Sequence, residues 1–118
     1  VDYVFISGGQ NDQSKYAANP IDSKSLILKT FTDLSTEFPK ATVFTIGPSS
    51  VSGDPVAWSP MEFIGKFVAM GAQSINSTEI ALLNPAVITS NMIATDHVHV
   101  TDVGHKAIAD KILSVINR

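Results

Sequence analysis

The chain of 118 residues contains no cysteine. This absence excludes a disulfide framework and any metal site built from thiolates, and it leaves the cellular compartment open. No block of Lys or Arg appears and the formal net charge is −3, so nucleic acids and anionic membranes are not expected partners. No apolar run approaches the roughly 20 residues of a membrane span. No signal peptide is visible either, although Val1 lies at or near the start of a predicted strand, so we expect the chain to begin inside a domain.

The composition is that of a folded domain. Hydrophobic residues make up 44% of the chain and charged residues of both signs make up 16%, which is typical of soluble globular proteins and not of disordered ones. The length suits one domain and not two. We therefore expect a single domain over residues 1–118, without internal repeats or a linker.

Apolar runs and helical spacing alternate along the chain. The run Val4–Ile6 predicts a strand buried on both faces, as in a parallel sheet, and two more strands are expected at 41–47 and 72–76. Three helices are predicted at Ser23–Phe38, at Ser59 to Met70 or Gly71, and at Thr101 to about Asn117. Residues 7–22 should form a loop, and residues 77–95 should form loop with short helical turns. This order predicts an α/β fold with a parallel sheet and right-handed crossovers.

Capping residues and apolar faces define the predicted helices more closely. Asp22 or Ser23 can cap the first helix, and Thr101 can cap the last. The stretch Ser59-Pro60-Met61-Glu62 has the pattern of a capping box with proline at the first helical position. Apolar residues of the last helix fall on one side, which we expect to be buried: Ile108, Ile112, Val115 and Ile116.

The first polar cluster is Gly8-Gly9-Gln10-Asn11-Asp12, directly after the first strand. In open α/β sheets, ligands bind beyond the carboxyl ends of the strands. Glycines allow the backbone to come close to a ligand, and an asparagine amide can donate a hydrogen bond to a developing oxyanion without bringing a charge. Taken alone, the stretch is better explained as a turn, since Gly, Asn and Asp are the usual turn residues.

The second cluster, residues 94–105, holds all three histidines of the chain. A carboxylate three residues before a histidine can hold the imidazole by its Nδ1–H and leave Nε2 free to act as a base. We prefer Asp96 and His99, which precede the helix, over Asp102 and His105, because Asp102 is explained as a favourable charge at the helix N-terminus. A polar loop with surface histidines is the alternative for the cluster as a whole.

His97 and His99 form a His-x-His pair of the kind found in metal sites. No third ligand is evident nearby in the sequence, so we do not expect a zinc site.

The two clusters together resemble the C-terminal part of an SGNH (GDSL-type) hydrolase. Gly9-Gln10-Asn11-Asp12 after a strand matches that superfamily's G-x-N-D block, and Asp96-His97-Val98-His99, followed by Gly104 and the final helix, matches its D-x-x-H block. The stretch PKATVFTIGP resembles the family's middle strand. The resemblance covers the whole chain and implies a three-layer, doubly wound parallel sheet of the flavodoxin-like type, with the N-terminal strands absent from this chain.

The chain also departs from the family pattern. The G-D-S block with the nucleophilic serine is missing, as is the block whose glycine N–H completes the oxyanion hole. The nearest string, Ser52-Gly53-Asp54-Pro55, has proline where serine is required and follows the wrong strand. Val100 replaces the proline that often follows the histidine. We therefore expect this chain to be a fragment of a domain whose N-terminal part supplies the nucleophile.

The resemblance implies a role for each matched residue. His99 is the base, Asp96 orients it and Asn11 is an oxyanion donor. Gly9 gives backbone clearance, and Asp12 braces the loop through backbone hydrogen bonds. No metal or organic cofactor is implied, and the substrate is a small ester or an acylated carbohydrate.

Alternatives to the esterase remain open. Without its serine, the chain is also compatible with a non-catalytic SGNH-like module that binds carbohydrate or serves assembly, and a flavodoxin-like or receiver domain is a weaker candidate. In the related strand order 2-1-3-4-5 the first strand here lies beside a missing strand. Val4–Ile6 would then present an open apolar edge, on which the N-terminal half of the domain or a second copy could pair.

Overall fold

The computed structural model describes residues 1–117, apart from the side chain of Gln10. The side chain of Gln10, the variable position of the Gly-Gln-Asn-Asp motif, and Arg118 thus lie outside what the structure describes. The elements in chain order are β1 (Tyr3–Ser7), the 3₁₀ helix η1 (Gln10–Asp12), α1 (Gln13–Ala18), α2 (Pro20–Glu37), β2 (Thr42–Ser49), α3 (Trp58–Ser74), β3 (Thr78–Leu82), the 3₁₀ helix η2 (Ser90–Met92) and α4 (Asp102–Ile116).

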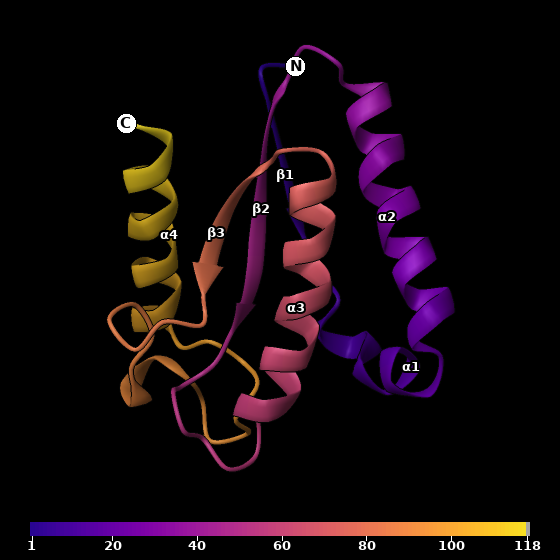
Figure 1. Cartoon of the computed structure of the whole chain (residues 1–118). Helices are drawn as coiled ribbons and strands as arrows, with labels where there is room; N and C mark the ends of the chain where they lie inside the picture. The colour runs from indigo at the N-terminus through magenta and orange to yellow at the C-terminus, as the bar shows by residue number, and fades with distance from the viewer. Residues whose placement is uncertain (118) are drawn as a thin grey trace.

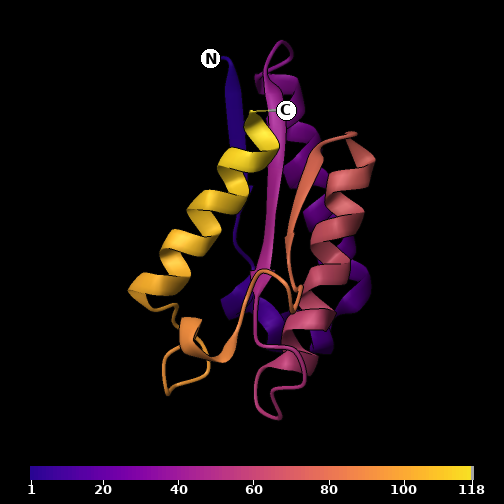
Figure 2. The same cartoon turned by 90° about the vertical axis from the view of Figure 1, so that its left-hand side faces the viewer.

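The three strands form one parallel sheet in the order β1-β2-β3. Helices α2 and α3 lie on one side of the sheet and α4 lies on the other, which gives three layers (Figure 1 and Figure 2). Parallel neighbours need long crossover connections, and α2 and α3 provide them. The predicted α/β fold with a parallel sheet between helical layers is confirmed.

Apolar side chains fill the space on both sides of the sheet. Under α4, the buried residues Phe44, Ile80 and Leu82 form one cluster. The apolar side of α4 packs against this cluster through the four residues expected to be buried: Ile108, Ile112, Val115 and Ile116. A second cluster is formed by the buried side of α3 and consists of Met61, Ile64 and Val68, with Tyr16 and Leu83 packed against it.

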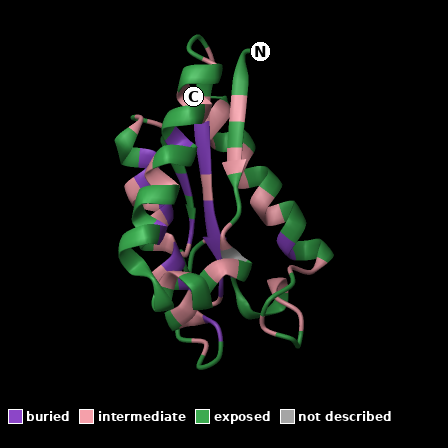
Figure 3. Cartoon of the chain, turned by 90° about the vertical axis from the view of Figure 1, so that its right-hand side faces the viewer, coloured by how far each residue is buried: buried purple, intermediate pink, exposed green. Residues whose placement is uncertain are grey.

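Strand β1 is less buried than its apolar sequence predicts. Tyr3 is 51% exposed and Phe5 is 44% exposed, so the prediction of a strand buried on both faces was wrong for this chain (Figure 3). The reason is its position at the end of the sheet, where it pairs only with β2. Helix α2 packs mainly on α3 and so leaves β1 largely uncovered. The open edge expected at Val4–Ile6 is present.

The segment predicted to be a loop at 7–22 contains more helix than expected. η1 and α1 fill most of it, and α2 begins at Pro20, three residues before the predicted start. Proline is favoured at the first helical position, because it has no N–H to leave unpaired. Asn19 occupies the N-cap without a side-chain hydrogen bond, so the caps predicted at Asp22 and Ser23 were wrong.

Helix α3 also differs from the prediction at both ends. It starts at Trp58, one residue early, and the capping box at Ser59 does not form. At the other end it continues to Ser74, so the strand predicted at 72–76 was wrong and β3 lies at 78–82 instead. We attribute the longer helix to its packing on α2. Gly71 comes so close to Phe31 that an added Cβ would lie 2.5 Å from the ring.

Candidate active site

The residues suited to chemistry lie at one end of the sheet. η1 follows the carboxyl end of β1, and the segment between β3 and α4 returns to the same end, where the loop after β2 also lies (Figure 1). Ligands bind at this edge in open parallel sheets. The two sequence motifs therefore share the edge that an active site of this fold uses.

Residues 93–100 form a short hairpin, which we call the 93–100 hairpin. Ile93 and Val100 make an antiparallel bridge, and the N–H of Ala94 donates to the carbonyl of His99 at 2.8 Å. Its tip carries Asp96 and the two neighbouring histidines. Local hydrogen bonds, and not burial in the core, define the conformation of this tip.

Asp96 and His99 are joined by a hydrogen bond between Oδ2 of Asp96 and Nδ1 of His99. Oδ1 of Asp96 also accepts the main-chain N–H groups of Val98 and His99, each at 2.9 Å. An ionised carboxylate can only accept, so Nδ1 carries the proton and Nε2 is left as the acceptor. The His99 side chain is 81% exposed, which makes Nε2 accessible to a substrate group.

The electrostatics of the pair suit a base and its orienting group. The hydrogen bond from the His99 side chain, with the two main-chain N–H groups, holds the pKa of the Asp96 carboxyl well below its usual value of 3.8. Asp96 therefore stays ionised in mildly acidic solution. A fixed carboxylate of this kind can stabilise the imidazolium form of a histidine.

The competing pair, Asp102 and His105, is arranged differently. Both lie in α4, and no hydrogen bond joins their side chains within residues 1–117. Thr101 caps the helix as predicted, because its Oγ1 accepts the N–H of Gly104 at 3.2 Å. Asp102 lies in the first turn, where its charge is favourable. The structure thus brings Asp96 and His99 together but not Asp102 and His105.

The Gly-Gln-Asn-Asp stretch forms a tight helical turn. Gly9 has a φ of +92°, and the N–H of Asp12 donates to its carbonyl at 3.1 Å. A Cβ at Gly9 would lie 3.2 Å from Oη of Tyr16, so this position favours glycine on two grounds. Asn11 is exposed. The carboxylate of Asp12 faces Nζ of Lys15 at 3.9 Å. The backbone N–H of Asp12, and not its side chain, therefore braces the turn.

A second aspartate–histidine pair was not predicted. Nδ1 of His97 lies 2.7 Å from Oδ2 of Asp54, in the loop between β2 and α3. The hydrogen bond from His97, followed by one from the N–H of Val56, lowers the pKa of Asp54. His97 and Asp54 line a hollow of about 370 Å³ that also includes Ser90. The partners are 43 residues apart, and no sequence spacing signals such a contact.

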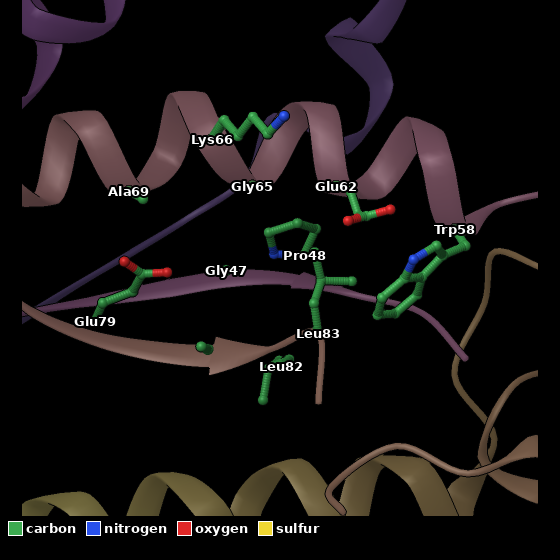
Figure 4. Close-up of a pocket in the computed structure, with 11 residues that line it drawn as sticks. Gly47, Pro48, Trp58, Glu62, Gly65, Lys66, Ala69, Glu79, Leu82 and Leu83 are labelled. Atoms are coloured by element: carbon green, nitrogen blue, oxygen red, sulfur yellow. The ribbon is translucent and has the colours of Figure 1, made fainter. Parts of the chain in front are cut away.

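Another concavity is a groove between α3 and the edge of the sheet. It has a volume of about 280 Å³, with Trp58 and Glu62 from α3 at one end and Glu79 from β3 at the other (Figure 4). Partial burial raises the pKa of the Glu79 carboxyl. Gly47 and Gly65 also line it, and their lack of side chains leaves the groove open.

Two further observations concern ligands and membranes. No group of three or more His, Asp or Glu side chains able to hold a metal ion occurs among the described residues. Within the same residues, no helix combines the length and apolar character needed to cross a membrane.

Comparison with known proteins shows which fold this is. No protein-family model matches the chain, and no curated protein sequence matches it. Its structure is similar to that of Axe2, an acetyl xylan esterase from Geobacillus stearothermophilus, with a TM-score of 0.67 and 22% identity over 96% of this chain. It is also similar to LAE5, an alpha/beta hydrolase from the metagenome of Lake Arreo, Spain, with a TM-score of 0.65 and 18% identity, again over 96% of this chain.

The chain spans 58% of the length of each of these two proteins. It therefore has the fold of part of an α/β hydrolase, as its resemblance to a partial hydrolase domain predicts. Another Axe2 structure, with a TM-score of 0.63, is of a catalytic mutant in which a histidine is replaced by alanine.

Proposed function

We propose that this chain carries the base and its orienting carboxylate for a serine esterase of the SGNH type, which cleaves short-chain acyl esters such as O-acetyl groups on carbohydrates. The observation that carries the proposal is the Asp96–His99 pair, which is hydrogen-bonded through Nδ1 and exposed at the carboxyl edge of the sheet. The fold shared with an acetyl xylan esterase supports the same class of reaction.

In the proposed mechanism, a serine hydroxyl attacks the ester carbonyl while Nε2 of His99 takes its proton. The carboxylate of Asp96 holds the imidazolium in place. Asn11 donates its side-chain N–H to the oxyanion that develops on the carbonyl oxygen, and Gly9 keeps the backbone clear of the substrate. The proton then passes from His99 to the departing alcohol, and water releases the acyl group from the serine by the same steps.

We place the nucleophile and the second oxyanion donor in a segment of the gene product that precedes Val1. No serine hydroxyl is hydrogen-bonded to His99 among residues 1–117, and β1 has a free edge. That edge is suited to the N-terminal half of the same domain, or to a second copy of this chain. A G-D-S motif on the order of 50–80 residues upstream, the length of two strand–helix units, is the expected finding.

Active-site labelling tests this assignment. The gene product that contains this chain is treated with a fluorophosphonate, digested and mapped by mass spectrometry, and its hydrolysis of nitrophenyl acetate and acetylated xylo-oligosaccharides is measured in parallel. We expect hydrolysis of both esters and a labelled serine outside residues 1–118. A labelled serine inside this chain, or no hydrolysis by a folded protein, would contradict the proposal.

A non-catalytic carbohydrate-binding module is the second candidate. The observation that favours it is the exposure of Asn11 and His99 at an edge where no serine is hydrogen-bonded to His99 within the described chain. Calorimetry with xylo-oligosaccharides separates the two functions. Binding without hydrolysis by the gene product supports the module, whereas turnover supports the esterase.

A further inference from the structure

We propose that Asp54 and His97 are positioning residues, which hold the 93–100 hairpin in the conformation that orients Asp96 and His99. The proposal rests on the proposed function, in which His99 is the base. The observations behind it are separate from that function. They concern a contact between two loops, a partly buried carboxylate and a residue with a left-handed backbone conformation.

Asp54 is the fixed end of this contact. Its side chain is only 12% exposed, and its Oδ1 accepts the N–H groups of Val56 at 2.8 Å and Ala57 at 3.1 Å. The other oxygen, Oδ2, faces Nδ1 of His97 at 2.7 Å. Three hydrogen bonds therefore hold the carboxylate just before α3 begins, and the hairpin is attached to a rigid point.

His97 has a backbone conformation that residues other than glycine rarely adopt. Its φ is +65°, in the left-handed region, where Cβ crowds the backbone of any residue except glycine. Such a residue persists only when its surroundings over-determine it. Two contacts do so here: the bond to Asp54 and the bond from the His97 N–H to the carbonyl of Ala94 at 3.0 Å.

The backbone of His97 sets the geometry of the neighbouring pair. It is the first residue after Asp96, and the turn it makes brings the N–H groups of Val98 and His99 to Oδ1 of Asp96. A change in φ at His97 would move both N–H groups, and the His99 ring with them, away from the carboxylate. Since the side chains of His99 and Asp96 are 81% and 48% exposed, little packing holds them and the contact with Asp54 supplies the restraint.

A competing interpretation makes the second pair catalytic in its own right. Ser90 lines the same hollow as Asp54 and His97, so the three residue types of a serine–histidine–aspartate triad are present. No hydrogen bond joins Ser90 to His97 among the described residues. We therefore assign Asp54 and His97 to positioning and let a Ser90 variant test the alternative.

The experiment compares four variants of the gene product: His97→Gly, Asp54→Ala, Ser90→Ala and His99→Ala. His97→Gly keeps a residue that tolerates positive φ but removes the ring that contacts Asp54, and Asp54→Ala removes the anchor. Two quantities are measured: amide hydrogen exchange at Val98 and His99, and kcat and KM for nitrophenyl acetate. The exchange measurement does not depend on activity.

We expect faster exchange at Val98 and His99 in both His97→Gly and Asp54→Ala, with kcat reduced about 10- to 100-fold and KM little changed. Ser90→Ala should match the wild type in both measurements, and His99→Ala should lose far more activity than His97→Gly. Unchanged exchange in both variants would overturn the proposal. The proposal would also be overturned if His97→Gly or Ser90→Ala lost as much activity as His99→Ala, because either residue would then take part in the chemistry itself.

The two proposals fail in different ways. If the folded wild-type protein hydrolyses no ester, the esterase function is wrong, and faster exchange in the two variants still supports the contact between Asp54 and His97. If the wild type is active and His99→Ala is inactive, while His97→Gly and Asp54→Ala match the wild type in exchange and rate, the positioning role alone is wrong.

Discussion

Replacing Gly104 by alanine should displace the 93–100 hairpin from the start of α4. Gly104 is buried in the first turn of the helix. An added Cβ would lie 2.2 Å from Cγ1 of Val100 and 2.3 Å from the carbonyl oxygen of Met92. Rotation of the Val100 side chain can relieve the first contact. The second contact involves the backbone of Met92, so either α4 or the segment from η2 into the 93–100 hairpin must move.

The expected magnitude follows from two opposing effects. Glycine to alanine inside a helix gains up to about 1 kcal/mol from propensity. Overpacking a close contact costs about 1–3 kcal/mol, and a clash with backbone belongs at the upper end. The net prediction is a loss of about 2 kcal/mol in the free energy of unfolding. Because the moved segment carries Asp96 and His99, the proposed esterase activity of the gene product should also fall.

Urea denaturation followed by circular dichroism measures this loss, and Gly65→Ala is the matched control. Gly65 lies in α3, where a Cβ would come no closer than 3.2 Å to the flexible end of Leu83. We expect Gly65→Ala to be neutral or stabilising by up to about 1 kcal/mol. If Gly104→Ala were as stable as the wild type, or more so, the close contact between α4 and the backbone of Met92 would be refuted.

Two further predictions concern single polar groups. Ser50 is 1% exposed, and its Oγ has no hydrogen-bond partner among the described residues. Ser50→Ala should therefore be neutral or stabilising by about 1 kcal/mol in the same urea assay. A clear destabilisation would mean that the hydroxyl has a partner. Because the pKa of Asp96 is lowered in the folded chain, the hydrogen bonds of its carboxylate stabilise the fold above pH 3.8, the usual pKa of an aspartate. This contribution is lost as the pH falls through the lowered pKa. The stability of Asp96→Asn should therefore fall less steeply below pH 3.8 than that of the wild type, and parallel curves would contradict the shift.

The features that local patterns determine were predictable from the sequence. The run Val4–Ile6, the apolar side of α4 and the cap at Thr101 gave a parallel α/β sheet and the final helix correctly. The short spacing of Asp96 and His99 likewise predicted a contact that one turn of chain can make. In these cases the interacting residues are neighbours in sequence or repeat at helical spacing.

The features that depend on distant contacts were not predictable. The third strand was misplaced because no local signal after Gly71 shows that α3 continues, and its close contact with Phe31 of α2 joins residues far apart in sequence. The pair of Asp54 and His97 joins two loops that only the folded chain brings together. The apolar run around Phe5 suggests burial. Phe5 is nevertheless exposed, because its burial depends on what covers the free edge of β1.

The most direct test of the central claim compares His99→Ala with His105→Ala in the gene product. Both histidines are exposed and lie in the same region, but only His99 is hydrogen-bonded to an aspartate three residues before it. The measurement is kcat/KM for nitrophenyl acetate. We expect a loss of at least about 10³-fold in His99→Ala and less than a twofold change in His105→Ala, as for the removal of a general base and of a surface residue. Equal rates in the two variants would contradict the assignment of His99 as the base.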